Sequence, residues 1–148
     1  MSYTFSGASI APAVKTASVA YFNNMAAMVA PILSPTLTDQ LTQKIQNQTR
    51  LQIVREEGDV SFEGEIINYI SAPIAISGNE TATKNRLTIS VKVRFTNKVD
   101  PKLSYDKTFS SYADYDTRQM LITIENQLIP EIVEKLVENI FNDAFSNW

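Results

Sequence analysis

Two stretches in the middle of the chain alternate apolar and polar residues with the period of two that is typical of half-buried β-strands. From Gly58 to Ile70, Val60, Phe62, Gly64 and Ile66 fall on one face, with serine and glutamate on the other. The segment from Asn85 to Asn97 alternates more strictly, with apolar residues at Leu87, Ile89, Val91, Val93 and Phe95. A turn separates it from a further strand at about Leu103 to Tyr112. This pattern predicts an antiparallel sheet with one solvated face.

Two other segments have the spacing of amphipathic helices. In the first, which runs to about Arg50, Ser34 suits the N-cap and Pro35 the first helical position. The second covers about 117–147 and has apolar pairs that give it a broad buried face. Pro130 lies inside this helix, where it removes a backbone hydrogen bond. We therefore expect a kink or a break near 126–130.

A first strand is predicted at about 15–22, with Ala17, Val19 and Tyr21 on one face. The element order is then β-α-β-β-β-α. A right-handed crossover makes the first two strands parallel, and the meander after them is antiparallel. The predicted fold is a single α+β domain over residues 1–148, a two-layer sandwich with a four-stranded mixed sheet and both helices on one face.

Composition removes several kinds of chemistry. The 148-residue chain has neither cysteine nor histidine, so thiol nucleophiles, zinc sites of the usual kind and histidine acid–base catalysis are excluded. The net charge of −3 argues against a nucleic-acid-binding protein. The longest apolar run, Met25 to Leu33, is too short to span a membrane and contains Pro31. No export signal is visible at the N-terminus, and no cofactor is predicted.

Two acidic residues and the tyrosine between them raise the question of catalysis. Asp114 and Asp116 flank Tyr115 just before the last helix, and a small hydrolase or isomerase using these three residues is one alternative. The other interpretation is that Asp116, three residues before Gln119, caps the helix in a capping box. The capping interpretation is favoured because no histidine or cysteine accompanies the acids.

A second acidic cluster lies around the second predicted strand, at Glu56, Glu57, Asp59, Glu63 and Glu65. Carboxylate oxygens can bind a hard cation, but the spacing is not that of a calcium loop. Alternating glutamates on the wet side of a strand are also typical of an ordinary solvated face. We therefore predict no metal site.

A basic row is the most distinctive polar feature. Arg86, Lys92 and Arg94 project from the same face of one strand, and Lys84 and Lys98 flank them. The segment 84–98 contains no acidic residue. Such a row can bind phosphates or carboxylates, and it can also protect an edge strand from aggregation. Taken alone, the solvated, edge-protecting interpretation is the simpler one.

Apolar segments outside the strands and helices have two interpretations. The loop at 24–35 and the segment at 71–80 either tuck under the sheet or form partner surfaces, and burial is the simpler prediction. The same choice applies to the C-terminal aromatics Phe141, Phe145 and Trp148, which either complete the core or protrude.

Several segments taken in order resemble a known family. They are YTFSGASIAPAVKTASVAYF, DVSFEGEIINYISAPIAISGNETATKNRLTISVKVRFTN, FSSYADYD and EIVEKLVENIFNDAFSNW. This series is similar to the lipopolysaccharide-assembly lipoprotein family, LptE, over nearly the whole chain. The series FEGEI, GNETATKNRLTI and YADYD is more specific than any single motif in the sequence.

The resemblance implies a non-enzymatic protein on the periplasmic side of the outer membrane of Gram-negative bacteria. Its partners would be a lipopolysaccharide-transport β-barrel of the LptD type, which it plugs and helps to assemble, and lipopolysaccharide itself. The family fold, two helices on a four-stranded sheet, agrees with the pattern. The membrane anchor would be a lipid on an N-terminal cysteine, which this chain lacks, so we expect a soluble form in which Met1 and Ser2 replace the export segment.

In this context the basic row gains weight, because lipopolysaccharide carries phosphates. We predict that Arg86, Lys92 and Arg94 contact lipopolysaccharide or acidic groups in the barrel lumen. The main alternative is a periplasmic lipid- or ligand-binding module without a barrel partner. Two features depart from the family pattern, namely the Met- and Ala-rich loop at 24–35 and Pro130.

Overall fold

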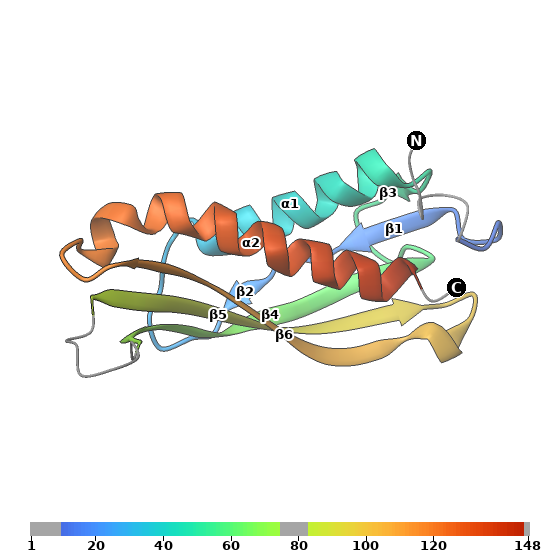
Figure 1. Cartoon of the computed structure of the whole chain (residues 1–148). Coiled ribbons are helices and arrows are strands. Elements are labelled where there is room, and N and C mark those ends of the chain that lie inside the picture. The colour runs from blue at the N-terminus through green and yellow to red at the C-terminus, as the bar shows by residue number, and fades with distance from the viewer. Residues whose placement is uncertain (1–9, 75–82, 147–148) are drawn as a thin grey trace.

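The computed structural model of the protein describes residues 10–74 and 83–146. Two helices, α1 (Leu33–Gln48) and α2 (Leu121–Phe145), cover one face of a mixed sheet, and the other face is open (Figure 1). A short 3-10 helix, η2, spans Pro101–Leu103. The strands are β1 (Thr16–Val19), β2 (Asn23–Asn24), β3 (Gln52–Ile53), β4 (Val60–Pro73), β5 (Lys84–Asn97) and β6 (Tyr105–Asp116).

The sheet has the order β3-β1-β4-β5-β6, with β2 also paired to β4. Strand β1 is parallel to β4, while β4, β5 and β6 form an antiparallel meander. The predicted two-layer α+β fold is therefore confirmed. The sheet has six strands rather than four, because β2 and β3 have only two residues each and leave no pattern in the sequence.

The predicted first strand is interrupted. Strand β1 ends at Val19 and β2 begins at Asn23, so residues 20–22 leave the ladder with β4. The prediction that Tyr21 shares a face with Ala17 is wrong, because the interruption changes the alternation. Phe22 is fully buried instead, and Tyr21 is 55% exposed.

The inward faces of β4 and β5 follow the predicted alternation. Every second residue of β5 from Leu87 to Phe95 is buried against the helices. In β4, a bulge between Ile66 and Asn68 shifts the alternation by one residue, so that Tyr69 is buried and Ile70 is exposed. A bulge of this kind places an extra residue in one strand and re-aims the side chains beyond it.

Aromatic rings fill the core between the sheet and the end of α2. Phe145 lies 5.9 Å from Phe62, 6.1 Å from Phe95 and 4.9 Å from Phe141, measured between ring centroids. Of the three C-terminal aromatics, Phe141 and Phe145 therefore complete the core. Trp148 lies outside the described residues.

Both helices begin without a side-chain cap. Helix α1 starts at Leu33, whose N–H donates to the carbonyl of Ala30, so the prediction that Ser34 caps it is wrong. Pro35 still lies in the first turn, where a missing N–H costs nothing. Helix α2 continues through Pro130, so no break occurs, although the ribbon changes direction in its N-terminal part (Figure 1).

Candidate functional site

The predicted basic row lies on the open face of the sheet, away from the helices. Arg86, Lys92 and Arg94 point outward from β5 and alternate with its buried apolar residues. Strand β5 is central, between β4 and β6, whereas β3 and β6 form the edges of the sheet. The interpretation of the basic row as protection of an edge strand is therefore wrong.

Each basic residue stands opposite an acidic residue of a neighbouring strand. Arg94 is in register with Glu63 of β4 and Asp106 of β6, Lys92 with Glu65, and Arg86 with Asp114. Cross-strand neighbours on one face lie close enough for their side chains to interact. The basic row is thus largely compensated by acids that are distant in the sequence.

Arg86 is held by two contacts. Its Nε and Nη2 atoms donate to the two carboxylate oxygens of Asp114 at 2.8 and 3.2 Å. Its guanidinium also lies 3.8 Å from the ring centroid of Tyr112. The Arg86 hydrogen bond, more than the nearby charges, holds the pKa of Asp114 below its usual value. This pairing occupies the face of Arg86 that an anion would use.

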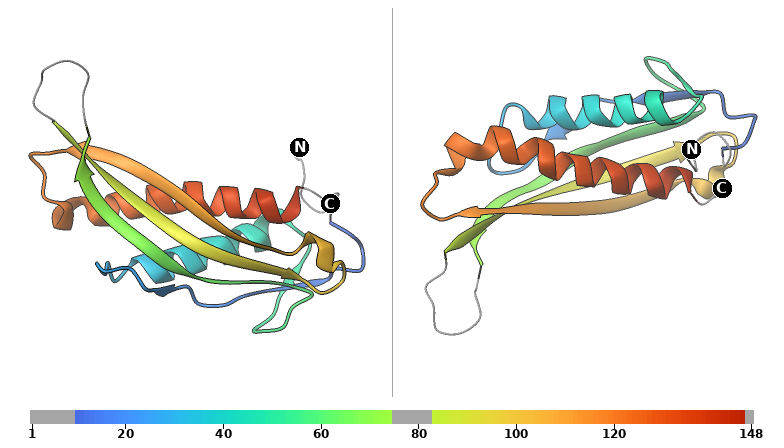
Figure 2. Two further views of the ribbon diagram at one scale, coloured as in Figure 1. Left: turned by 90° about the horizontal axis from the view of Figure 1, so that it is seen from below. Right: turned by 45° about the horizontal axis from the view of Figure 1, so that its top comes forward.

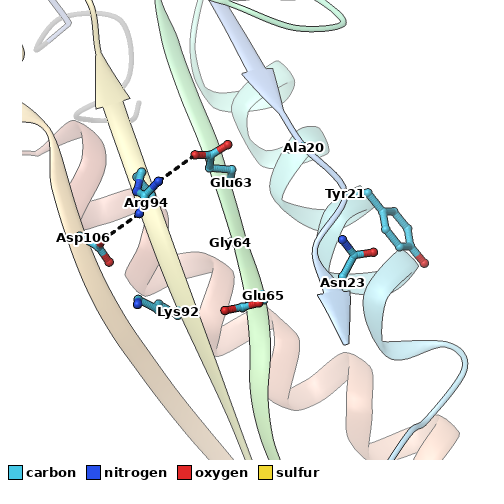
Figure 3. A pocket seen from close by; sticks show the side chains of 9 residues that line it. All are labelled: Ala20, Tyr21, Asn23, Glu63, Gly64, Glu65, Lys92, Arg94 and Asp106. Carbon is cyan, nitrogen blue, oxygen red and sulfur yellow. Dashed lines mark hydrogen bonds and ion pairs between the residues drawn. The ribbon is translucent and has the colours of Figure 1, made fainter. Parts of the chain in front are cut away.

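Arg94 and Lys92 are more available. Arg94 contacts Glu63 and Asp106 at 3.5 Å each, and its side chain is 59% exposed. Lys92 makes no ion pair within 4 Å among the residues that the structure describes. Figure 3 shows Arg94 between its two carboxylates, with Lys92 and Glu65 beside them.

A pocket of about 350 Å³ opens over these residues. It forms where residues 20–22 leave the sheet, between the main chain of that interruption and the open faces of β4, β5 and β6 (Figure 3). The lining residues are Ala20, Tyr21, Asn23, Glu63, Gly64, Glu65, Lys92, Arg94 and Asp106. Sequence analysis placed Glu63 and Glu65 on the wet face, but it missed Asp106 and the interruption, because both depend on strand register.

Gly64 closes the floor of this pocket. A Cβ atom there would lie 1.9 Å from the carbonyl oxygen of Lys92 and 3.0 Å from the ring of Phe22. The first contact is with backbone, which cannot move aside without disturbing the β4–β5 pairing. Only glycine therefore fits at this position.

The acidic residues before α2 do not form a cap or an acid–base site. Helix α2 begins at Leu121, and Asp116 ends β6, five residues earlier, so the prediction that Asp116 caps the helix is wrong. Its strand continues because Asp116 pairs in register with Lys84. The Asp116 carboxylate instead accepts hydrogen bonds from the backbone N–H and guanidinium of Arg118.

These contacts also argue against the enzyme alternative. The hydrogen bonds from Arg118 hold the pKa of Asp116 well below its usual range, as Arg86 does for Asp114. A general acid at neutral pH needs the opposite shift. Tyr115, the third member of the proposed set, is buried, and its hydroxyl is hydrogen-bonded to that of Ser71.

The second acidic cluster is dispersed into separate structural roles. Asp59 accepts hydrogen bonds from the backbone N–H groups of Lys15 and Thr16, and the first of these is the main reason that its pKa is lowered. Glu57 pairs with Lys98 at 3.6 Å. Within the described ranges no group of three or more acids could hold a metal ion.

Several exposed apolar side chains belong to segments at the end of the molecule where α2 begins, which we call the apolar end. It combines the β2–α1 loop, the far part of β4 and β6, and the start of α2 (Figure 2). The prediction that the loop at 24–35 is buried is wrong for part of it, and residues 75–80 of the other apolar segment lie outside the described residues. The side chains of the apolar end are Met25, Met28, Val29, Ile70, Tyr112, Met120 and Ile122.

The chain is a small two-layer α+β protein with a charged pocket on its open sheet face. No helix within the described ranges has the length and apolar character needed to cross a membrane. A family model described as Lipopolysaccharide-assembly, LptE, matches residues 14–144. The chain belongs to this family, as its sequence indicated.

Solved structures with the same fold have low sequence identity to this chain. A minor lipoprotein from Acinetobacter baumannii is 16% identical, with a TM-score of 0.59 and coverage of 91% of this chain and 95% of that one. The hypothetical protein CT253 from Chlamydia trachomatis is 8% identical, with a TM-score of 0.59 and coverage of 90% and 99%. A putative lipoprotein from Caulobacter crescentus is 12% identical, with a TM-score of 0.55 and coverage of 83% and 86%.

No protein with a curated description matches the sequence significantly. Family membership nevertheless assigns the chain a role in lipopolysaccharide assembly. The members of this family are non-enzymatic, which confirms the prediction that the protein is not an enzyme.

Proposed function

We propose that the protein is an outer-membrane lipoprotein, anchored on the periplasmic side, that plugs and helps to assemble the lipopolysaccharide-transport β-barrel of the LptD type. Family membership over residues 14–144 supports this proposal. The open sheet face supports it as well, because the lumen of a large outer-membrane barrel is polar. The apolar end offers a surface of the kind that proteins use for contact with partners.

Within this function, Lys92 and Arg94 contact lipopolysaccharide or acidic groups of the barrel lumen. The observation that carries this proposal is the availability of both cations on the open face, since Lys92 forms no ion pair with any described residue and the contacts of Arg94 are 3.5 Å long. Arg86, predicted to share this role, is paired with Asp114 and supports the sheet instead.

Co-purification tests the barrel partner. The full-length lipoprotein, expressed with its native precursor sequence and an affinity tag, is expected to retain the transport barrel through detergent extraction. We also expect that the precursor has a lipidated cysteine just before Tyr3. If the protein binds lipopolysaccharide but never retains a barrel, the alternative of a periplasmic ligand-binding module is correct.

Charge reversal tests the role of the two cations. The double variant K92E/R94E is expected to bind lipopolysaccharide about tenfold more weakly than the wild type, because two favourable contacts are lost. The matched control is K15E/K102E, which makes the same charge change at exposed lysines outside the pocket. Thermal unfolding checks that each variant is folded, and K92Q/R94Q replaces the first variant if repulsion from Glu63 and Asp106 unfolds it. Unchanged binding in the folded double variant contradicts the proposed role.

A further inference from the structure

The pocket on the open face is created by the main chain rather than by loose side chains. The β1–β4 ladder ends where the N–H of Ala20 donates to Phe62, at 2.9 Å, and the β2–β4 ladder reaches the N–H of Met25, which donates to Ile66 at 2.8 Å. Between them, the N–H of Phe22 donates to the Thr38 hydroxyl of α1 at 3.1 Å. Helix α1 thus holds the interruption in place, and the pocket is preformed.

The polar groups of the pocket are of both hydrogen-bonding types. Glu63, Glu65 and Asp106 are acceptors, Lys92 and Arg94 are donors, and Asn23 at the rim is both. The three carboxylates and two cations give the lining a formal charge of −1. A good ligand must therefore both donate and accept, and it gains little from a charge of its own.

Several polar groups keep capacity for a ligand. Glu65 and Lys92 are in register on neighbouring strands, yet they form no ion pair within 4 Å. The two contacts of Arg94 are at the long limit for hydrogen bonds and use one nitrogen each, so its remaining N–H groups can reach into the pocket. Glu65, Lys92 and Arg94 hydrogen-bond to water in the free protein and to a ligand when one binds.

Two ligand classes fit this pocket poorly. A phosphate beside Lys92 would share the pocket with three carboxylates, which repel it. A divalent cation would face Lys92 and Arg94, and no described group of three or more acids is arranged to hold one. Vicinal hydroxyl groups satisfy both the donors and the acceptors, since each hydroxyl donates one hydrogen bond and accepts others.

We propose that this pocket binds a saccharide through its hydroxyl groups. The inference rests on the proposed function, and it assigns the pocket to the sugar portion of lipopolysaccharide rather than to its phosphates or acyl chains. Tyr21 contributes at the rim, where its side chain is turned away from the acids and the residue is 55% exposed (Figure 3). The apolar C–H face of a sugar unit that extends beyond the interruption contacts this ring.

Chemical-shift mapping by NMR tests the site directly. The probe is the core oligosaccharide of lipopolysaccharide, freed of its acyl chains and phosphates, and inorganic phosphate is the anion probe. The oligosaccharide is expected to give saturable shifts confined to the amides of residues 20–23, 63–65, 92–94 and 106, and phosphate to give none there. Shifts outside the pocket, no shifts, or stronger shifts with phosphate would overturn the inference.

Two variants determine the chemistry of binding. Glu65→Gln removes a charged acceptor without changing shape, and it is expected to weaken oligosaccharide binding about threefold to tenfold. If the pocket bound anions, the same change would strengthen binding. Lys92→Met is expected to weaken oligosaccharide binding by a similar factor, whereas Lys102→Met, an exposed lysine outside the pocket, leaves it unchanged. Unchanged binding in both pocket variants refutes the proposal.

The result is separable from that of the proposed function. Intact lipopolysaccharide and barrel co-purification report on the function, and the lipid-free oligosaccharide reports on the pocket. Retention of the barrel and of intact lipopolysaccharide with no oligosaccharide binding rejects the saccharide pocket alone. Loss of the barrel partner with oligosaccharide binding intact rejects the plug function alone.

Discussion

Arg86 and Arg94 project from the same face of the same strand, but they have different surroundings. Arg86 makes a bidentate contact with Asp114 at 2.8 and 3.2 Å and stacks on Tyr112. Arg94 is shared between Glu63 and Asp106 at 3.5 Å each and is 59% exposed. One arginine therefore joins two strands, while the other keeps hydrogen-bonding capacity for a ligand.

The difference arises from the neighbouring strands rather than from β5. Near Arg86, the edge strand β6 supplies both a carboxylate and an aromatic ring, and these hold the guanidinium from two directions. Near Arg94, the interruption between β1 and β2 opens a pocket, and the two carboxylates pull on the guanidinium from opposite sides (Figure 3). A basic row is thus a binding surface only where register and packing leave its side chains free.

The largest effect is expected from a side chain at Gly64, which lines the pocket and is in register with Val93. Gly64→Ala forces a Cβ atom to within 1.9 Å of the carbonyl oxygen of Lys92, so β4 and β5 must separate locally. We expect a loss of about 3 kcal/mol in the free energy of unfolding, measured with urea. Thr96→Ala, on the neighbouring strand and without such a clash, serves as the control. A loss below about 1 kcal/mol would show that the sheet adapts easily at this end.

The next largest effect is expected in lipopolysaccharide binding, where substitution of the two arginines should give different losses. Arg94→Ala is expected to weaken binding about threefold to tenfold, because it removes an available donor from the pocket. Arg86→Ala is expected to have a smaller effect, since Arg86 is already paired. The affinity of both variants for immobilised lipopolysaccharide is measured under the same conditions. A larger loss for Arg86→Ala would place the contact at the apolar end rather than at the pocket.

The fold was predictable where a pattern repeats along several residues. The alternation predicted the faces of β5 and of β4 up to its bulge correctly, and the helical spacing predicted α1, in which Leu37, Leu41 and Ile45 are buried. The two-residue strands and the interruption at 20–22 were not predictable, because they depend on pairing with β4 and on the Thr38 hydroxyl of α1. Local pattern carries no information on such distant partners.

The same limit applies to the site. The alternation correctly placed Arg86, Lys92 and Arg94 on the wet face, but their acidic partners lie on other strands, and Asp114 is 28 residues away from Arg86. The spacing of Asp116 and Gln119 is that of a capping box, yet the ladder with β5 extends β6 to Asp116 and delays the helix. In both cases cross-strand pairing overrode a local signal.

A smaller difference is expected in stability. Asp114→Asn weakens the bidentate contact with Arg86, whereas Asp106→Asn removes one of two long contacts of Arg94. Because all these groups are at least partly exposed to solvent, each effect is small, but the first should lower the thermal midpoint more than the second. Differential scanning calorimetry at low salt compares the two variants with the wild type. Equal midpoints would mean that the geometric difference between the arginines has no energetic counterpart.

The smallest effect is the pH dependence of the same contacts. The pKa of Asp114 lies below its usual value of 3.8 in the folded protein, chiefly because of the Arg86 hydrogen bond. A carboxyl group with a lowered folded-state pKa stabilises the fold fully above the unfolded-state pKa, and this contribution is lost as the pH falls through the folded-state value. The stability difference between the wild type and Asp114→Asn should therefore shrink as the pH falls below the usual carboxyl value of 3.8. Asp116→Asn should behave in the same direction, since the hydrogen bonds from Arg118 also lower the pKa of Asp116 in the folded protein. A difference that stays constant over this range would show that Asp114 acts through the shape of its side chain and not through its charge.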